Sequence, residues 1–197
     1  MDAVRAVTGT AVALPRSDVD TDQIIPAEHL KRVERTGFGQ FLFAAWRADP
    51  GFVLNRREHQ GAQVLVAGPN FGTGSSREHA VWALLDYGFR AVVSSRFGDI
   101  FRVNCTKNGL VPAPIAADAA EALLAAVADD PRLEVSVDVE HRTVEAPGIG
   151  FAAPFDLDDA TQERFLLGLD DIGLTLRHHD AIAGYETGRR PWLPSVR

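Results

Sequence analysis

The sequence predicts an α/β fold built on a parallel sheet, and two observations carry this prediction. Between residues 63 and 113, short apolar segments alternate with longer amphipathic ones in the order strand, helix, strand, helix, strand. This order is typical of parallel sheets, in which a helix lies in each crossover between strands. The chain has 197 residues, of which 46% are hydrophobic and 24% charged, enough for one sizeable core in a soluble globular protein.

The N-terminal third predicts one strand followed by short irregular elements. Residues 4–14 contain several β-branched side chains and end before a proline, which predicts a strand. The aspartate-rich residues 17–23 predict a polar turn, and residues 26–35 a short helix that begins at a proline. Residues 36–43 are aromatic and punctuated by glycines. They predict a loop that packs apolar groups, followed by a helix through Trp46.

The central segment carries the alternation itself. Residues 63–67 are a nearly continuous apolar run, which is typical of a buried strand. A glycine-rich loop follows, and then a helix over 75–87 with apolar residues on one face. Apolar strands over 90–94 and 110–113 enclose a helix over 97–106, and a glycine follows each of the two helices as a stop.

The C-terminal part predicts a hairpin between helices. Residues 118–128 are alanine-rich and predict a helix. Residues 133–139 and 142–146 alternate between apolar and polar side chains, which predicts two antiparallel strands. Residues 158–169 and 171–185 predict two last helices.

Composition excludes several classes of function. The net charge of −7 lacks the basic footprint that nucleic-acid binding needs, so no nucleic-acid partner is expected. No run of about 18 apolar residues or secretory leader occurs, so no membrane association is expected. The only cysteine, Cys105, excludes a disulfide framework and fits the cytoplasm. One thiol cannot hold an iron–sulfur cluster, and zinc spacing is absent, so we expect this chain to bind no metal.

The most informative segment is the loop 72–79, which reads Gly-Thr-Gly-Ser-Ser-Arg-Glu-His. It lies between a predicted strand and a predicted helix, so backbone N–H groups and the positive helix end converge on an anion-binding position. The phosphate-loop pattern fails because no lysine follows the glycines, and the dinucleotide pattern fails because Arg77 replaces its third glycine. Small anions remain, carboxylates above all, which Arg77 can bind through two parallel hydrogen bonds.

A purely structural interpretation of this loop competes with the chemical one. Ser75 and Glu78 have the spacing of a capping box at a helix N-terminus. A capping box explains neither the two glycines nor Arg77. An arginine at the positive end of a helix is unfavourable unless an anion or an acidic side chain compensates it.

The loop also carries a family resemblance. Residues 70–80 resemble the signature of the swivelling domain of aconitases and isopropylmalate isomerases. Residues 19–26, 36–39 and 168–176 are similar to the isomerase small subunits, so the resemblance covers nearly the whole chain. Thr73 departs from the cysteine that bacterial small subunits often have at this position.

The resemblance implies a fold and a reaction. The implied fold is a swivelling β/β/α domain of the aconitase type with additional C-terminal helices. It forms a single domain over residues 1–197, with a core over about 1–155 and the helices over about 156–190. The implied reaction interconverts 2-isopropylmalate and 3-isopropylmalate through isopropylmaleate, in leucine biosynthesis. A large partner subunit supplies the [4Fe-4S] cluster as the Lewis acid, and the chain is active only in that heterodimer.

The resemblance also assigns roles at the site. Ser75 is implied as the general base in its alkoxide form, Ser76 as an assisting group, Arg77 as the ligand of a substrate carboxylate, and Asp22 as an aspartate that orders the pocket. The assignment of Ser75 is physically coherent. An alkoxide needs N–H donors, a helix end and a nearby cation, and this loop has all three.

The segment after Asp22 is implied to face the part of the substrate that differs between family members. Aconitase has a serine at the position of Ile25, which disfavours citrate here. Arg32 lies near the place where aconitase binds a third carboxylate, so a basic contact stays open. Leu30 and the aromatic residues of 38–43 are candidates for an apolar wall around an isopropyl group, or for plain core packing.

One other pattern suggests a site, and two other classes of function compete with the isomerase. Asp18, Asp20 and Asp22 have calcium-loop spacing, but Gln23 and His29 stand where such a loop needs glycine and glutamate, so calcium is rejected. The rivals for the function as a whole are a related two-subunit hydratase acting on homoaconitate, citraconate or another small dicarboxylate, and a non-catalytic anion- or RNA-binding module.

Overall fold

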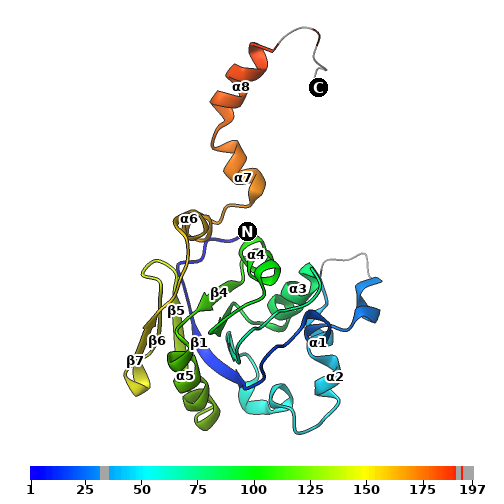
Figure 1. The fold of residues 1–197 in the computed structure, drawn as a ribbon, viewed down its shortest axis with the longest axis vertical. Helices are drawn as coiled ribbons and strands as arrows, with labels where there is room; N and C mark the ends of the chain where they lie inside the picture. Colours follow the sequence, from blue (N-terminus) through cyan, green and yellow to red (C-terminus); the bar gives the residue numbers. More distant parts are fainter. Residues whose placement is uncertain (32–35, 190–191, 193–197) are drawn as a thin grey trace.

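The computed structural model describes residues 1–31, 36–189 and 192. Its centre is a seven-stranded sheet in the order β4-β3-β2-β1-β5-β6-β7 (Figure 1). Strands β1 to β4 run parallel, whereas β5, β6 and β7 add to β1 in antiparallel fashion. The strands are β1 Ala6–Leu14, β2 Val64–Ala67, β3 Ala91–Ser94, β4 Val111–Pro114, β5 Glu134–Asp138, β6 Thr143–Ala146 and β7 Phe151–Pro154.

Strand β1 joins the two halves of the sheet because its two ends have different partners. Its C-terminal half pairs with β2 from Ala11 to Leu14, and its N-terminal half pairs with β5 from Ala6 to Thr10. Both faces of the parallel half are covered, so β2 and β3 are buried at every position. This explains why their sequences are continuous apolar runs rather than alternating ones.

Helices cover both faces of the sheet. One apolar core lies under α3 and α4 and the short elements before β2, and the other lies under α5 and α6 (Figure 1). The helices are α1 Thr21–Ile24, α2 Ala44–Arg47, α3 Glu78–Tyr87, α4 Asp99–Asn108, α5 Ala117–Asp129, α6 Asp159–Leu167, α7 Asp171–Leu176 and α8 His179–Thr187. Turns of 3₁₀ helix occur at Ala27–Lys31, Gly39–Phe41, Val53–Asn55, Arg57–His59 and Pro147–Ile149.

The predicted α/β class is confirmed, and most elements lie within a few residues of their predicted ranges. The helix predicted over 75–87 was wrong at its start, because α3 begins at Glu78 after an extended N-cap residue, Arg77, with φ −125° and ψ 105°. Strand β7 was not predicted. Its sequence, Phe-Ala-Ala-Pro, has little strand preference, and its proline is tolerated because β7 is an edge strand.

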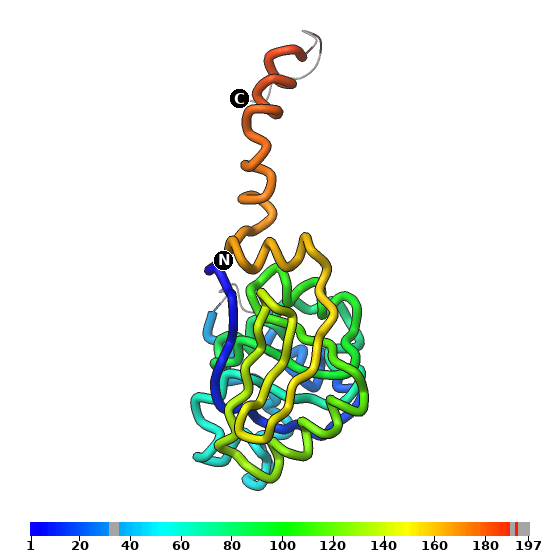
Figure 2. The backbone as a smooth tube through the Cα atoms, turned by 90° about the vertical axis from the view of Figure 1, so that its left-hand side faces the viewer, coloured from blue at the N-terminus to red at the C-terminus, as the bar shows by residue number. Residues whose placement is uncertain are grey.

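The last helix was predicted as one element over 171–185 and is two. His178 leaves the helical backbone with φ −101° and ψ 20°, between α7 and α8. The break follows Arg177, whose Nη1 donates to Glu163 Oε1 on α6 at 2.7 Å. Helices α7 and α8 extend away from the sheet and its covering helices (Figures 1 and 2). The assignment of residues 1–197 to a single domain stays a prediction.

Candidate active site

The loop after β2 is clamped between two other segments of the chain. Thr73 forms a bridge with Asp20, and Phe71 forms one with Phe97. The N–H of Gly72 donates to Val19 O at 2.7 Å, and the N–H of Thr21 donates to Thr73 O at 2.9 Å. Backbone hydrogen bonds therefore fix the loop from both sides.

Gly72 is required by both its backbone angle and its surroundings. Its φ is +77°, a left-handed conformation that side chains disfavour. A Cβ atom at Gly72 would lie 2.2 Å from Cγ of Phe101, a ring that is 2% exposed on α4. Gly98 approaches from the same side, since its own Cβ would lie 2.4 Å from Gly72 O. The close contact between the loop and the start of α4 excludes larger residues at both positions.

Ser75 and Ser76 are exposed in the stretch between this clamp and α3. Thr21 Oγ1 donates to the carbonyl oxygen of Ser75 at 3.1 Å, which positions its backbone. Within the described residues, neither serine hydroxyl has a hydrogen-bond partner. The capping box predicted from Ser75 and Glu78 was wrong, because Arg77 is the N-cap residue and no side chain caps α3.

Several backbone N–H groups around Ser75 have no hydrogen-bond partner among the described residues. The N–H groups of residues 74–77 bond to no other described residue. They lie where α3 begins, so the partial positive charge of the helix end adds to theirs. The stretch is therefore arranged to stabilise negative charge, either on a ligand or on a serine oxygen.

Arg77 has the acidic partner that its position at a helix start demands. Its Nη1 donates to Asp22 Oδ1. The Arg77 side chain is 16% exposed, whereas that of Asp22 is 52% exposed. Among the described residues the other N–H groups of the guanidinium have no hydrogen-bond partner, so they are available to a ligand.

Asp22 is positioned by a capping box on α1. The N–H of Gln23 donates to Asp20 Oδ1 at 2.7 Å, and Gln23 Oε1 accepts from the N–H of Asp20 at 2.9 Å. Asp18 accepts from Asn70 Nδ2 at 2.6 Å. The three aspartates that have calcium-loop spacing thus serve three different partners.

Sequence reasoning did not find the network that holds the start of α3. Asn108, interpreted as part of a helix end, donates from Nδ2 to Glu78 Oε1 at 2.8 Å and to Asn104 O at 2.9 Å. Its Oδ1 accepts from Trp82 Nε1 at 2.9 Å. A helix-terminal asparagine gives no signal that its partners lie on another helix.

His79 packs beside this network. Its ring lies 4.6 Å from the Trp82 ring and 5.3 Å from the Phe38 ring, measured between centroids. Burial, with a smaller contribution from the Arg77 charge, lowers the pKa of His79. A neutral packing residue agrees with the interpretation that His79 supports the site rather than carrying a proton.

The residues predicted to face the variable part of the substrate differ in how deeply they are buried. Phe38, Leu42 and Phe43 are fully buried in the core, so these three do not form an apolar wall at the surface. Leu30 is half-buried and packs against the same core. Arg32 lies outside the described residues.

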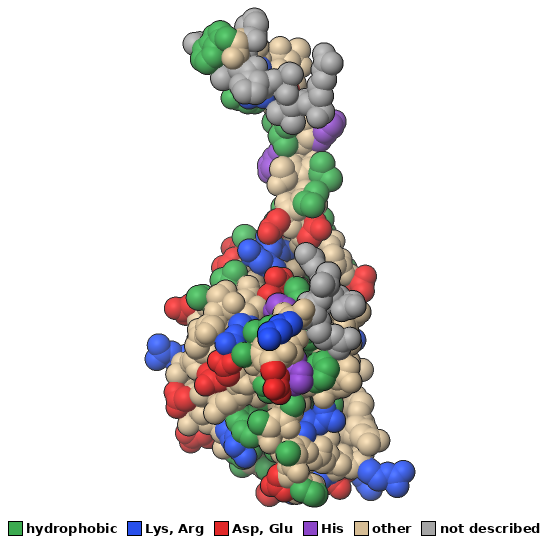
Figure 3. All heavy atoms as spheres, turned by 90° about the vertical axis from the view of Figure 1, so that its right-hand side faces the viewer, with side chains coloured by type: hydrophobic (Ala, Val, Ile, Leu, Met, Phe, Trp, Pro, Cys, Tyr) green, Lys and Arg blue, Asp and Glu red, His purple; other side chains and the backbone are tan. Residues whose placement is uncertain are grey.

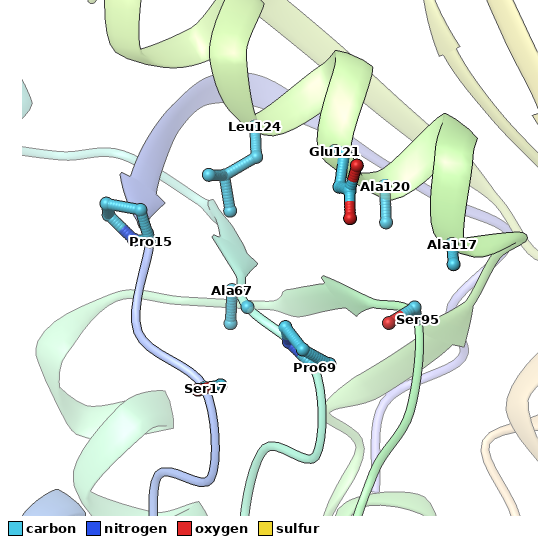
Figure 4. Close-up of a pocket in the computed structure, with 10 residues that line it drawn as sticks. Pro15, Ser17, Ala67, Pro69, Ser95, Ala117, Ala120, Glu121 and Leu124 are labelled. Atoms are coloured by element: carbon cyan, nitrogen blue, oxygen red, sulfur yellow. The ribbon is translucent and has the colours of Figure 1, made fainter.

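Neither Ser75 nor Arg77 lines any of the four cavities found among the described residues. Figure 3 shows charged and histidine side chains gathered near the middle of one face of the body. A cavity of about 390 Å³ lies where β1, β2 and β3 end, next to α5, but its lining is mainly apolar and includes neither Ser75 nor Arg77 (Figure 4). Its lining residues are Pro15, Ser17, Ala67, Gly68, Pro69, Ser95, Ala117, Ala120, Glu121 and Leu124.

The described residues contain no cluster of three or more histidine, cysteine, aspartate or glutamate side chains arranged to hold a metal ion. Cys105 is fully buried, and burial raises the pKa of its thiol well above the usual range. This matches its interpretation as a small core residue. In the part of the chain that the structure describes, no helix has the length and apolarity that a membrane crossing requires.

Comparison with known proteins assigns the chain to a family. A model of the aconitase C-terminal domain matches residues 1–118, and a model of the C-terminal domain of the 3-isopropylmalate dehydratase small subunit matches residues 171–195. The 3-isopropylmalate dehydratase small subunits of Frankia alni and Rubrobacter xylanophilus are 60% and 56% identical to it, each over 100% of both chains. The chain belongs to the 3-isopropylmalate dehydratase small-subunit family.

Solved structures agree with this assignment. The crystal structure of 3-isopropylmalate dehydratase (LeuD) from Methanocaldococcus jannaschii is similar with a TM-score of 0.68 and 25% identity, over 92% of this chain and 99% of that one. The predicted aconitase-type fold and membership of this hydro-lyase family, with its role in leucine biosynthesis, are therefore confirmed. The roles of individual residues are not tested by these similarities.

Proposed function

We propose that this chain supplies the proton-transferring side of a 3-isopropylmalate dehydratase active site, with Ser75 as the general base. One observation carries the proposal: Ser75 is exposed on a fixed loop, and its hydroxyl does not cap α3. The neighbouring backbone N–H groups bond to no described residue, and the Arg77 guanidinium follows two residues later. A structural serine at a helix start would use its oxygen as a cap. Here that oxygen is available for chemistry.

Ser75 can act as a base only if its deprotonated form is stabilised. The free N–H groups of the loop, the end of α3 and the Arg77 charge all favour an oxyanion at this point. In the proposed reaction, Ser75 Oγ accepts the proton from the substrate carbon next to the one that bears the hydroxyl. The electron pair of that C–H bond forms the double bond of isopropylmaleate as the hydroxyl leaves. Readdition of water at the other carbon, with return of the proton, completes the isomerisation.

Arg77 is proposed to bind a substrate carboxylate, with Asp22 as its positioning partner. Asp22 holds one N–H of the guanidinium, which leaves the rest of the planar fork for a second, bidentate carboxylate. Ser76 is proposed to add a polar contact from the same exposed stretch. Leu30 and Arg32 stay proposals for recognition of the substituent that distinguishes isopropylmalate from related acids.

A large subunit is proposed to complete the site in a heterodimer. The relatives of this chain are named small subunits. Ser75 and Ser76 are exposed, so a second polypeptide can cover the loop that carries them. The residues present here do not fit an iron–sulfur cluster, because the only thiol is buried. We therefore assign the [4Fe-4S] cluster, and activation of the leaving hydroxyl, to the large subunit. The cytoplasmic location stays a prediction.

Ser75→Ala in the reconstituted pair tests the base. We expect kcat to fall by about 10²–10⁴-fold, the usual contribution of a general base, while the pair still assembles. Ser95→Ala is the matched control, because Ser95 lines the separate cavity beside α5 and should leave kcat unchanged. An assembled Ser75→Ala pair with activity within a few-fold of wild type would contradict the assignment.

Arg77→Lys tests the carboxylate contact in the same assay. Lysine keeps the charge but lacks the fork, so we expect kcat/KM to fall by about 10- to 100-fold, the equivalent of one charged hydrogen bond. An unchanged kcat/KM would exclude Arg77 as a carboxylate ligand. Assaying the wild-type pair on homoaconitate and citraconate as well then defines which small dicarboxylate the site prefers.

A further inference from the structure

Six large apolar side chains on α4, at the end of α6 and on the two last helices are left exposed. Each is at least half exposed, which is unusual for so many large apolar residues along connected elements. We call them the apolar strip. Its members are Ile100 and Val103 on α4, Leu167 at the end of α6, Ile172 and Leu176 on α7, and Tyr185 on α8.

The part of the strip on α4 connects residues 72–79, which carry Ser75 and are called the catalytic loop, to the projecting helices α7 and α8. Ile100, Val103 and Lys107 are spaced three and four residues apart, so they lie on one face of α4. At the start of α4, Gly98 lies against Gly72 of the catalytic loop. At the other end, Lys107 Nζ lies 4.0 Å from Oδ2 of Asp171, the first residue of α7. The strip therefore begins beside the site and continues onto α7.

The base of the projecting helices is fixed by charged contacts. Asp171 accepts from Arg164 on α6 at 2.5 Å, and Arg177 donates to Glu163 on α6 at 2.7 Å. Asp170 caps α7 by accepting from the N–H of Gly173 at 2.7 Å. These contacts set the direction in which α7 leaves the body, so its apolar residues are held in one arrangement.

Beyond this base, α7 and α8 have too little support to be stable alone. They contain 6 and 9 residues, fewer than the roughly 12–15 that an isolated helix needs in water. No residue of either helix is buried within the described part of the chain. Figure 3 shows apolar side chains along these helices facing the solvent. Their apolar faces therefore lack the cover that such short helices require.

The exposed area matches one side of a stable interface. At roughly 100 Å² of exposed surface for each side chain, the strip leaves on the order of 600 Å² uncovered. This is at the upper end of what a monomer leaves exposed in one patch. It approaches the ~800 Å² that one partner contributes to a standard interface.

We propose that the apolar strip is the docking surface for the large subunit. The inference rests on the proposed function, in which Ser75 is covered by that partner. Because the strip starts at the catalytic loop, one polypeptide that covers the site reaches the strip through α4 without a break. A second copy of this chain bound there would instead occupy the approach to the catalytic loop.

The test replaces two members of the strip in the full-length chain and measures assembly with the large subunit. Ile172→Asp/Leu176→Asp puts two charges on one face of α7, where both side chains are exposed, so the fold of the body should be unaffected. We expect the dissociation constant of the heterodimer to rise at least ~30-fold by sedimentation, with kcat within a few-fold of wild type when the large subunit is saturating. Far-UV circular dichroism of the chain verifies that it is folded.

Ile149→Asp is the matched control. Ile149 is 51% exposed in the 3₁₀ turn between β6 and β7. This turn lies at the end of the body away from the projecting helices (Figure 1). The control should assemble like wild type. A wild-type dissociation constant for the α7 double variant overturns the proposal. So does a chain that self-associates through α7 and loses only that association in the double variant.

The outcome separates this inference from the proposed function. Ser75→Ala should assemble with wild-type affinity and fail in turnover, whereas the α7 variant should show the reverse. If Ser75→Ala keeps its activity while the α7 variant still loses affinity, the base assignment falls and the docking surface stands. If the α7 variant assembles normally and Ser75→Ala is inactive, only the docking surface is overturned.

Discussion

Replacing Gly72 with alanine tests whether the loop of residues 72–79 is fixed by its contact with α4. At φ +77°, any L side chain costs about 1–2 kcal/mol in backbone strain. The added Cβ would also lie 2.2 Å from Cγ and 2.7 Å from Cβ of Phe101, so a buried ring and its attachment to α4 must move. Overpacking of this kind costs about 1–3 kcal/mol. We therefore expect Gly72→Ala to lower the free energy of unfolding by about 2–5 kcal/mol.

Gly61→Ala is the control that separates strain from steric conflict. Its φ is +82°, close to that of Gly72, but a Cβ there would meet nothing within 4 Å. It should therefore cost only the backbone term of about 1–2 kcal/mol. With a urea m-value of about 2–3 kcal/mol/M, the midpoint of unfolding should fall by about 1 M or more for Gly72→Ala and by about 0.5 M for Gly61→Ala. Equal shifts for the two variants would refute the claim that α4 packs against the loop.

Two further predictions concern the support of the site and the core. Asn108→Ala removes the hydrogen-bond partner of the Trp82 indole N–H and of the Glu78 carboxylate. We expect the free energy of unfolding, measured by urea titration, to fall by about 1–3 kcal/mol. A fall of less than about 0.5 kcal/mol would contradict the network. Burial lowers the pKa of His59 below its usual 6.5, so the unfolded chain takes up this proton first as the pH falls, and the stability present above pH 6.5 is lost on acidification. His59→Leu should therefore show a smaller loss of urea midpoint between pH 7.5 and pH 5 than wild type, and an equal loss would contradict the role of burial.

The parallel half of the sheet could be predicted from the sequence because local and tertiary preferences agree there. Strands β2 and β3 are buried on both faces, which forces a continuous apolar sequence that no exposed element needs. Gly88 and Gly109 end α3 and α4 with positive φ, so the helix stops were visible as glycines. Burial and backbone geometry restrict which residues these positions can hold, so the strands and the helix ends can be predicted from the sequence.

The parts that could not be predicted depend on partners that are remote in sequence. The pairing of Arg77 with Asp22 and of Asn108 with Glu78 joins segments 55 and 30 residues apart, and no periodicity records such contacts. The capping box at Ser75 failed for the same reason. Hydrogen bonds between the loop and the residues Val19 and Thr21 hold the loop in a clamped conformation, and this tertiary restraint overrides the local preference of Ser75 for capping.

The open position of Ser75 has a consequence for when the site can work. In water, the N–H groups of the loop and the Arg77 charge are screened, so they stabilise an oxyanion weakly. Because the Asp22 carboxylate is 52% exposed, the Asp22–Arg77 pair should contribute no more than about 1 kcal/mol to the free chain. In the proposed complex the large subunit excludes water from this surface, which strengthens the same dipoles and the same guanidinium without moving them. A substrate carboxylate then meets an Arg77 that Asp22 has already oriented, and Ser75 gains basicity only once both the substrate and the second polypeptide are in place. In the proposed complex, the position of Ser75 at the subunit interface therefore controls its reactivity, because its oxyanion is stabilised only after assembly.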